Sequence, residues 1–362
     1  MLLRNLSVKK GLCNVSSILL PIEEAKKKGI YALKWNSSRL SWKNWVTLGA
    51  GLLAVCLVVY FLFFNGPSYY YNRDFDAQLA KFIHVSPAAR KLPKSGSLFC
   101  WAMTSTKYHG DRVPAVNGTW LPRCDHGQFF TNDAMDPELN IAYSTVFAGI
   151  PDTYENLFFK TRYALRHIYR NISSQFNWYL KADDDTYVIV ENLRAYLAKL
   201  DPNIPYYLGY RLRPYLEHGY NGGGAGYVLS RAAMELFSEK LYDNATLCPD
   251  DIYEDLGVGR CFANVQIYPL DTRNNRGQQR FNTFRPDQVF KGSVVKAPYW
   301  IYDVEIKGFD AVGEDLVSFH HITPDEMRLF EMLLYRVRKP STPQNPTPDT
   351  LISKADSKNH NR

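Results

Sequence analysis

The stretch that decides the fold is WYLKADDDTYV at residues 178–188. Its apolar run ends in three adjacent carboxylates, Asp183, Asp184 and Asp185. A helix is predicted directly afterwards, because apolar residues recur there at i, i+3, i+4 and i+7. These residues are Leu193, Tyr196, Leu197 and Leu200. The carboxylates therefore lie at the carboxyl end of a strand, where open α/β sheets bind their ligands.

Three adjacent carboxylates repel one another unless a cation lies among them. Their hard oxygen atoms favour Mg²⁺ or Mn²⁺, which can also bind the phosphates of a nucleotide. The triplet therefore indicates a site for a metal-bound nucleotide-sugar, although a solvated acidic turn remains an alternative. A calcium loop is excluded, because Val188 and Arg194 stand where that loop needs Gly and Glu.

The net positive charge of the chain lies in its first 45 residues. The 362 residues carry a net charge of +7, and residues 1–45 hold nine Lys and Arg against two Glu. The remaining residues are therefore neutral overall, which argues against a nucleic-acid partner. The length allows one large or two small domains with an ample core.

Residues 46–64 contain no charge and approach the ~20 residues that cross a bilayer as a helix. A buried core helix rarely lacks polar residues on every face, and no cleavage site for a signal peptide follows. The basic flank predicts a type II anchor with residues 1–45 in the cytosol. We expect a stem at 65–95, a lumenal domain at 96–337, a disordered tail at 338–362 and residence in the Golgi membrane.

Four of the six cysteines lie in the predicted lumenal part. An oxidising lumen favours disulfides among these four, which allow three connectivities. The two sequence-local pairs, Cys100–Cys124 and Cys248–Cys261, are favoured because each closes a short loop. A zinc site is the alternative, but the spacing typical of one is missing. Three sequons fit the same compartment, and they lie at Asn117, Asn171 and Asn244.

Residues 97–104 are predicted as the first strand, and the polar loop after it holds Lys107 and Arg112. Both side chains could meet phosphates there or remain solvated. A helix over 156–171 and a strand over 206–210 are expected to flank the acidic strand. The glycine run at 221–230 (NGGGAGYVLS) lacks the Lys of a phosphate loop and the last glycine of a dinucleotide fingerprint.

We interpret Gly223 and Gly224 in that run as positions where the backbone approaches a bulky ligand closely. Ser230 is expected to cap the helix that follows. Glu254 and Asp255 start another helix, where they could favour the macrodipole or supply a general base.

Aromatic residues at 297–302, among them Trp300 and Tyr302, could stack on a sugar or pack in the core. The last predicted strand ends in His320 and His321. Because neighbouring side chains of a strand face opposite ways, at most one of the two is expected to be a ligand.

These motifs, in this order, resemble the β1,3-galactosyltransferase superfamily (glycosyltransferase family 31). Within it the closest likeness is to the enzymes that build core 1 O-glycans. The likeness spans roughly residues 96–335 and is carried by 176–188, 223–230, 254–261 and 317–320. It implies a GT-A type α/β fold in a single lumenal catalytic domain, and a homodimer.

The resemblance further implies transfer of galactose from UDP-galactose, with Mn²⁺, to N-acetylgalactosamine α-linked to Ser or Thr of a glycoprotein. It implies Asp185 and His320 as metal ligands, with Asp183 on the ribose or a metal-bound water. It implies Asp255 as the catalytic base, and Trp300 as the aromatic residue that stacks on the acceptor. The full donor set expected is Asp183, Asp184, Lys107, Arg112, Gly223 and Gly224, and the acceptor set is Trp300, Tyr302 and Glu254.

The chain departs from the family pattern at two places, of which the second lies near the acceptor side. Gly222 stands where the familiar members have Ser, and residues 303–315 lack the paired cysteines found there in those members. Two alternatives therefore remain, a sibling enzyme with a glycolipid or O-fucose acceptor and a non-catalytic chaperone. Chaperone-like relatives lack the acidic triplet, which this chain retains.

Overall fold

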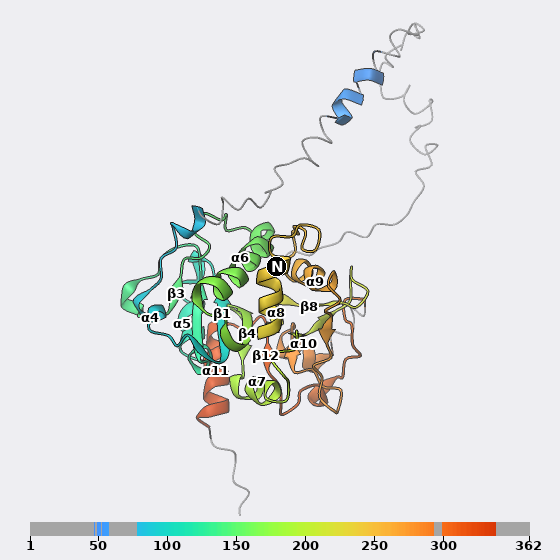
Figure 1. The fold of residues 1–362 in the computed structure, drawn as a ribbon. Coiled ribbons are helices and arrows are strands. Elements are labelled where there is room, and N and C mark those ends of the chain that lie inside the picture. The colour runs from blue at the N-terminus through green and yellow to red at the C-terminus, as the bar shows by residue number, and fades with distance from the viewer. Residues whose placement is uncertain (1–46, 48, 52, 58–77, 293–298, 338–362) are drawn as a thin grey trace, which may run out of the picture. The chain divides into compact units, whose positions relative to one another are not determined.

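The structure is a computed structural model that describes residues 47, 49–51, 53–57, 78–292 and 299–337 (Figure 1). The chain divides into two compact units, Met1–Tyr71 and Asn72–Arg362. In the first unit the described residues are helical. None of the helices formed by described residues reaches the length and apolar character of a membrane span.

Several predicted segments fall wholly or partly outside the described residues. They are the cytosolic tail at 1–45, much of the span at 46–64, positions 65–77 of the stem, positions 297 and 298 of the aromatic segment, and the tail at 338–362.

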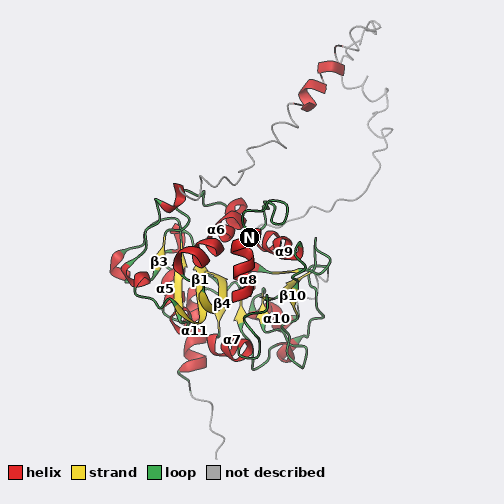
Figure 2. Ribbon diagram, in the orientation of Figure 1, coloured by secondary structure: helices red, strands yellow, loops and turns green. Residues whose placement is uncertain are grey.

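A seven-stranded sheet forms the centre of the second unit, in the order β10-β6-β9-β4-β1-β2-β3 (Figures 1 and 2). Its strands are β1 (Ser95–Met103), β2 (His126–Phe130), β3 (Tyr143–Ser144), β4 (Gln175–Asp183), β6 (Tyr207–Leu208), β9 (Tyr227–Ser230) and β10 (Pro269–Leu270). Strand β9 runs antiparallel to β4 and β6, and the other neighbours are parallel. This mixed sheet with its helices confirms the α/β class and is consistent with a GT-A type fold.

Strands β1 and β4 are the two longest and pair in parallel. Every residue is buried from Leu98 to Met103 in β1 and from Trp178 to Ala182 in β4, as in strands covered on both faces. The register pairs Met103 with Asp183, so the two strands end together. The acidic triplet therefore begins at the carboxyl edge of the sheet, as predicted.

Helices cover both faces of the sheet (Figure 1). On one face Leu98 and Ala102 join a core cluster with residues of α5 (Arg112–Asn117), α7 (Val190–Leu197) and α11 (Pro324–Tyr335). On the other face lie α6 (Leu157–His167), α8 (Arg231–Leu236) and α9 (Glu254–Ala263). There Tyr207 stacks on Phe262 of α9, and α8 packs on β4. Ser230 accepts a hydrogen bond from the Ala233 amide and so caps α8, as predicted.

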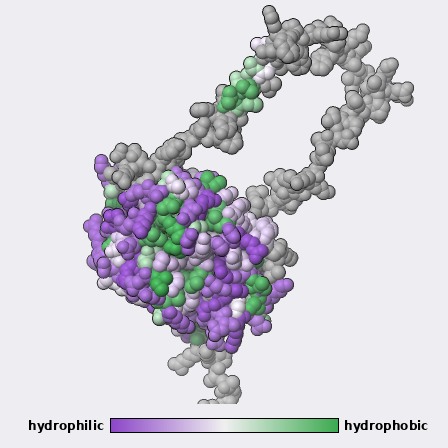
Figure 3. Space-filling model, turned by 45° about the vertical axis from the view of Figure 1, so that its right-hand side comes forward, coloured by the Kyte–Doolittle hydropathy of each residue, from purple (hydrophilic) through white to green (hydrophobic). Residues whose placement is uncertain are grey.

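Two smaller sheets lie beyond the carboxyl edge. One has the order β11-β12-β5, with β5 (Tyr187–Val188), β11 (Phe281–Asn282) and β12 (Ser318–Phe319). The other pairs β7 (Arg211–Leu212) with β8 (Tyr220–Asn221). Short helices α4 (Pro87–Arg90) and α10 (Pro286–Lys291) complete the unit. On the face in Figure 3, hydrophilic side chains predominate and hydrophobic ones gather in separate patches.

Both predicted disulfides are present, Cys100–Cys124 and Cys248–Cys261. The first joins β1 to the chain just before β2. The second joins the loop before α9 to α9 itself, with a sequence separation of 13 residues. It therefore restrains the helix that begins with Glu254 and Asp255.

We expect replacement of both Cys248 and Cys261 by Ser to lower the free energy of unfolding by about 2–4 kcal/mol, because the crosslink restricts the unfolded chain. Urea unfolding of secreted residues 75–362, followed by circular dichroism, measures this change. Replacing Cys100 and Cys124 is the matched comparison, since that pair closes a loop of 24 residues. An unchanged urea midpoint in the first variant would contradict the expectation.

Candidate active site

The site lies where β1 and β4 end and the chain turns into β5. The turn is closed by the Thr186 amide, which donates to the Asp183 carbonyl at 3.2 Å. Within it, Asp184 is buried and accepts hydrogen bonds from the Thr104 hydroxyl and from Arg112, each at 2.7 Å. Burial raises the pKa of Asp184 to about 6 despite these bonds. Asp184 thus ties the turn to the loop that follows β1.

Asp183 is held from within the sheet by Lys181. The buried Lys181 ammonium lies 2.6 Å from Asp183 and 3.6 Å from Glu254. Burial acts to lower the pKa of Lys181, but these two carboxylates raise it above the usual range. The ammonium therefore stays charged and fixes both acids, one from β4 and one from α9.

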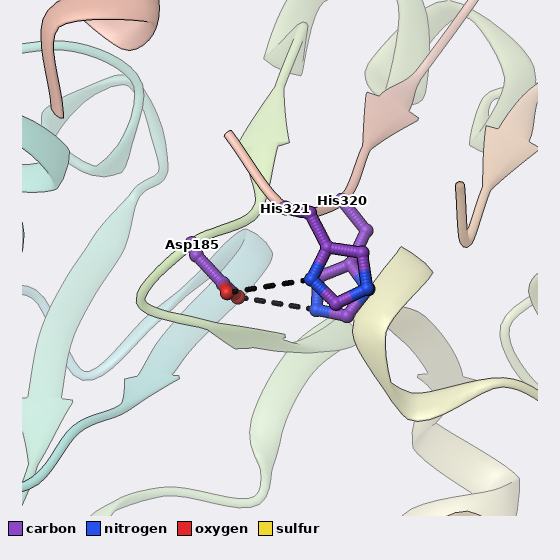
Figure 4. Close-up of side chains that lie close together, drawn as sticks. All are labelled: Asp185, His320 and His321. Atoms are coloured by element: carbon purple, nitrogen blue, oxygen red, sulfur yellow. Dashed lines mark ion pairs between the residues drawn. The ribbon is translucent and has the colours of Figure 1, made fainter. Parts of the chain in front are cut away.

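Asp185 faces the two histidines (Figure 4). Its two oxygens lie 3.1 Å from Nε2 of His320 and 3.7 Å from Nδ1 of His321. Burial acts to raise the pKa of Asp185, yet its hydrogen bonds with both rings hold it well below the usual range. One ligand atom from each of the three residues lies within 4.8 Å of the others, a spacing that can hold a metal ion.

The prediction that the two histidines face opposite ways is wrong. Strand β12 ends at Phe319, so strand alternation does not extend to the two histidines. His321 adopts φ 57°, and the amide of Ile322 donates to the Asp185 carbonyl at 2.9 Å. The rings of His320 and His321 stack 3.6 Å apart, and both reach Asp185.

The glycine run lies against these side chains. A Cβ atom at Gly224 would stand 2.0 Å from Cε1 of His320, and one at Gly223 would stand 2.5 Å from a Glu254 oxygen. Thr186 also donates to the Gly224 carbonyl at 2.8 Å. The backbone at these glycines thus closely approaches the side chains of Glu254 and His320, whereas the expected approach to a bulky ligand stays a prediction.

Asp255 begins α9 and lines a cavity of ≈ 630 Å³ together with Trp300 and His320. It accepts hydrogen bonds from the amides of Leu256 at 2.8 Å and Gly223 at 3.4 Å. Burial raises the pKa of Asp255 above the usual range, which makes its carboxylate a stronger base. Such a carboxylate can accept a proton from a group in the cavity, and it also complements the helix dipole at the start of α9.

A second cavity of ≈ 510 Å³ adjoins the first, and both are lined by Met103, Tyr154, Leu157, Asp183 and His320. The second is also lined by Asp184 and Asp185 and by three cations, Lys107, Arg112 at the start of α5 and Lys160 of α6. Asp183 and His320 therefore border both a cavity of mixed charge and the cavity that contains Asp255.

Several predicted site residues already have partners within the protein. Arg112 pairs with Asp184 and Asp185, and the Lys107 ammonium lies 4.5 Å from the ring of Tyr108. Glu254 accepts from the buried Tyr227 hydroxyl at 2.7 Å, although it also lines the larger cavity. The Tyr302 ring packs under Arg211 and is not among the residues that line the larger cavity.

Sequence reasoning missed Lys181, which joins the two acidic motifs. A signal existed, because Lys181 and Asp183 are two residues apart on one strand and so share a face. Lys160 was missed as well. Its position on α6 indicates burial against the sheet, and only the fold shows its ammonium 2.5 Å from Asp152 beside the second cavity.

The predicted sequons lie apart from the site. Asn117 ends α5 and is half-buried, while Asn171 is exposed in the π-helical turn after α6. Asn244 is half-buried and accepts hydrogen bonds from the amides of Thr246 and Leu247.

Comparison with known proteins places these residues in a wider group. The model of the Fringe-like family matches residues 94–275. Glycoprotein-N-acetylgalactosamine 3-beta-galactosyltransferase 1 of Xenopus laevis is 30% identical over 256 residues, which cover 69% of either chain. Human beta-1,3-glucosyltransferase is 29% identical over 54% of this chain and 39% of its own. Mouse chondroitin sulfate synthase 3 is 26% identical over 47% of this chain and 21% of its own.

We expect Gly224→Ala to weaken Mn²⁺ binding by about 10–100-fold, as the loss of a group that orients a metal ligand does. The added methyl group has to displace the His320 ring. Titration calorimetry with manganese chloride measures the change. Gly110→Ala is the matched control, since no atom lies within 4 Å of its added Cβ, and equal affinities in the two variants would contradict the role given to Gly224.

Proposed function

Because the chain belongs to the Fringe-like family, we propose that it is an inverting β1,3-galactosyltransferase that acts on glycoproteins. It moves galactose from UDP-galactose to the 3-hydroxyl of N-acetylgalactosamine linked to Ser or Thr. The observation that carries this proposal is Asp255, half-buried and with a raised pKa, in a cavity that borders the Asp185–His320 pair. The name of the Xenopus relative supports the choice of donor and acceptor.

The donor atoms fit a divalent cation such as Mn²⁺. A carboxylate of Asp185 and Nε2 of His320 lie 3.1 Å apart, and Asp183 lies 4.0 Å from the same nitrogen. Carboxylate and imidazole together suit a first-row divalent ion. A cation bound here offsets the charge that develops on the leaving diphosphate.

The donor occupies the second cavity in this proposal. Its cations, Lys107 and Arg112, face the negative charge of the diphosphate, while Asp183 and Asp184 bound the same space. Gly223 and Gly224 line the larger cavity, where the sugar lies in this proposal, and their missing side chains leave room for Glu254 and His320 beside it.

Asp255 performs the proton transfer. The 3-hydroxyl oxygen of the acceptor attacks the anomeric carbon from the face opposite the diphosphate, and its proton passes to Asp255. The new bond to oxygen forms as the bond to the diphosphate breaks, so the configuration inverts. Backbone amides of Leu256 and Gly223 hold the carboxylate in place for this step.

Aromatic side chains supply the acceptor surface. Trp300 lines the larger cavity. The ring of Tyr215 meets the Trp300 ring in an edge-to-face arrangement, with 6.3 Å between the ring centroids. Aromatic faces of this kind stack on the apolar face of a sugar. In this proposal Glu254 and Tyr302 support the acceptor surface indirectly. Glu254 pairs with Lys181, and the Tyr302 ring packs against Arg211.

We also propose that residues 46–64 anchor the protein in the Golgi membrane with the catalytic unit in the lumen, and that two copies form a homodimer. Neutral charge outside residues 1–45 supports the absence of a nucleic-acid partner.

A panel of UDP-sugars and acceptors, with and without Mn²⁺, tests the function on secreted residues 75–362. Transfer of galactose to peptides that carry GalNAc-α-threonine is the expected result. Transfer of glucose instead would point to the reaction named for the human relative. Transfer only to a glycolipid or an O-fucose acceptor would identify the sibling enzyme, and inactivity across the whole panel would favour the chaperone.

Asp255→Asn is expected to lower kcat by about 10²–10⁴-fold, the usual contribution of a general base. UDP affinity should remain nearly intact, because the second cavity does not include Asp255. Steady-state kinetics and UDP titration measure the two effects separately. A loss of UDP binding in this variant would give Asp255 a different role.

The pH profile of kcat should fall on the acid side. Only the ionised carboxylate accepts a proton, and burial raises the pKa of Asp255. Activity is therefore present above that raised pKa and lost as the pH falls through it, at a higher pH than an exposed aspartate would give. An activity that stays flat down to the pKa of a free aspartate would contradict this assignment.

A further inference from the structure

We propose that His321 is a third protein ligand of the metal, beside Asp185 and His320, and that this second imidazole makes the site select transition ions over Mg²⁺. The use of the ion in catalysis rests on the proposed function, whereas the ligand set rests on the geometry alone. No resemblance or spacing in the sequence pointed to His321.

The ligand atoms already converge. Each oxygen of Asp185 faces a different ring, at 3.1 Å for His320 and 3.7 Å for His321 (Figure 4). The two rings are stacked with an interplanar angle of 28°, so their reaching nitrogens lie on the same side of the pair. An ion among these atoms meets one carboxylate and two imidazoles, the set of a facial triad with open positions.

The backbone holds His321 in this position. Its φ of 57° is sparsely populated by residues with a side chain, so neighbouring contacts have to maintain it. The next amide, of Ile322, donates to the Asp185 carbonyl, and Arg285 donates to the His321 carbonyl. Arg285 also pairs with Glu326, which with Thr323 forms the capping box of α11.

Among the described residues, no polar group other than Asp185 is seen to hold the His321 ring in place. Its side chain is 54% exposed, and the polar contact recorded for the ring there is the one with Asp185. The ring also borders the larger cavity, so an ion held by it remains open to a ligand. Burial in a core therefore does not explain where this ring points.

The competing explanation is an ion pair without metal. Arg112 lies 3.3 Å from the same Asp185 oxygen that faces His321, so the carboxylate already has a cationic neighbour. In that case His321 adds charge to the pair, and its removal leaves the affinity for a metal unchanged. The two explanations thus differ in a measurable quantity.

A second imidazole changes which ions bind. Oxygen ligands and water suit Mg²⁺, whereas imidazole nitrogens suit first-row transition ions, with affinity rising from Mn²⁺ to Co²⁺. With two nitrogens and one carboxylate, the site should bind Co²⁺ and Mn²⁺ more tightly than Mg²⁺. Removing one nitrogen should reduce the preference as well as the affinity.

The test uses the full-length chain in detergent with manganese chloride alone, without nucleotide. Two variants preserve the backbone of residue 321, because Gly and Asn both tolerate positive φ: His321→Gly and His321→Asn. His320→Gln is the positive control, and His218→Gln, at an exposed position that lines neither site cavity, is the matched control. Melting temperatures verify that each variant is folded.

Pulsed electron paramagnetic resonance of bound Mn²⁺ should detect two imidazole nitrogens in the original chain and one in His321→Gly. The Mn²⁺ affinity of both His321 variants should fall by more than about 10-fold, since even loss of an outer partner costs roughly that much. The ratio of Mn²⁺ to Mg²⁺ affinity should fall with it.

One nitrogen in the original chain, or unchanged Mn²⁺ affinity in both His321 variants, would overturn the proposal. Neither readout depends on sugar transfer. An inactive protein with two coordinating nitrogens would therefore refute the proposed function and leave the ligand assignment intact, and an active protein with one nitrogen would do the reverse.

Discussion

The antiparallel pairing of β5 with β12 holds together the two halves of the site. It aligns Val188 with Ser318 and Tyr187 with Phe319, so the residues that continue from the pair are Asp185 on one side and the histidines on the other. A slip of one residue would turn every side chain to the opposite face. The Ser318 hydroxyl resists this slip by donating to the Ala225 carbonyl inside the glycine run, at 2.6 Å.

Around this pairing, the three adjacent aspartates have separate surroundings. Asp183 faces the buried ammonium of Lys181, Asp184 binds Thr104 and Arg112, and Asp185 faces the histidines. Each carboxylate thus has an oppositely charged or donating neighbour, which offsets the repulsion expected within the triplet. The division leaves Asp185 as the carboxylate that meets two imidazoles.

Much of this arrangement was predictable from local patterns. The strands that end at Met103 and Asp183, the cap at Ser230 and both disulfides follow from hydrophobic runs and short spacings. The partner of each glycine was not predictable, because contacts such as Gly224 with His320 join distant segments. The second histidine was missed for another reason. Alternation assumes a continuing strand, whereas β12 stops at Phe319.

The position of β12 has a consequence for synthesis on the ribosome. It is the middle strand of its sheet, between β11 and β5, yet it comes last of the three in the chain. Until it emerges, β5 and β11 have no partner, and the aspartates stand without their histidines. Since such non-local pairing is slow to form, a nascent polypeptide with every preceding strand in place still lacks the contacts of Asp185 with His320 and His321.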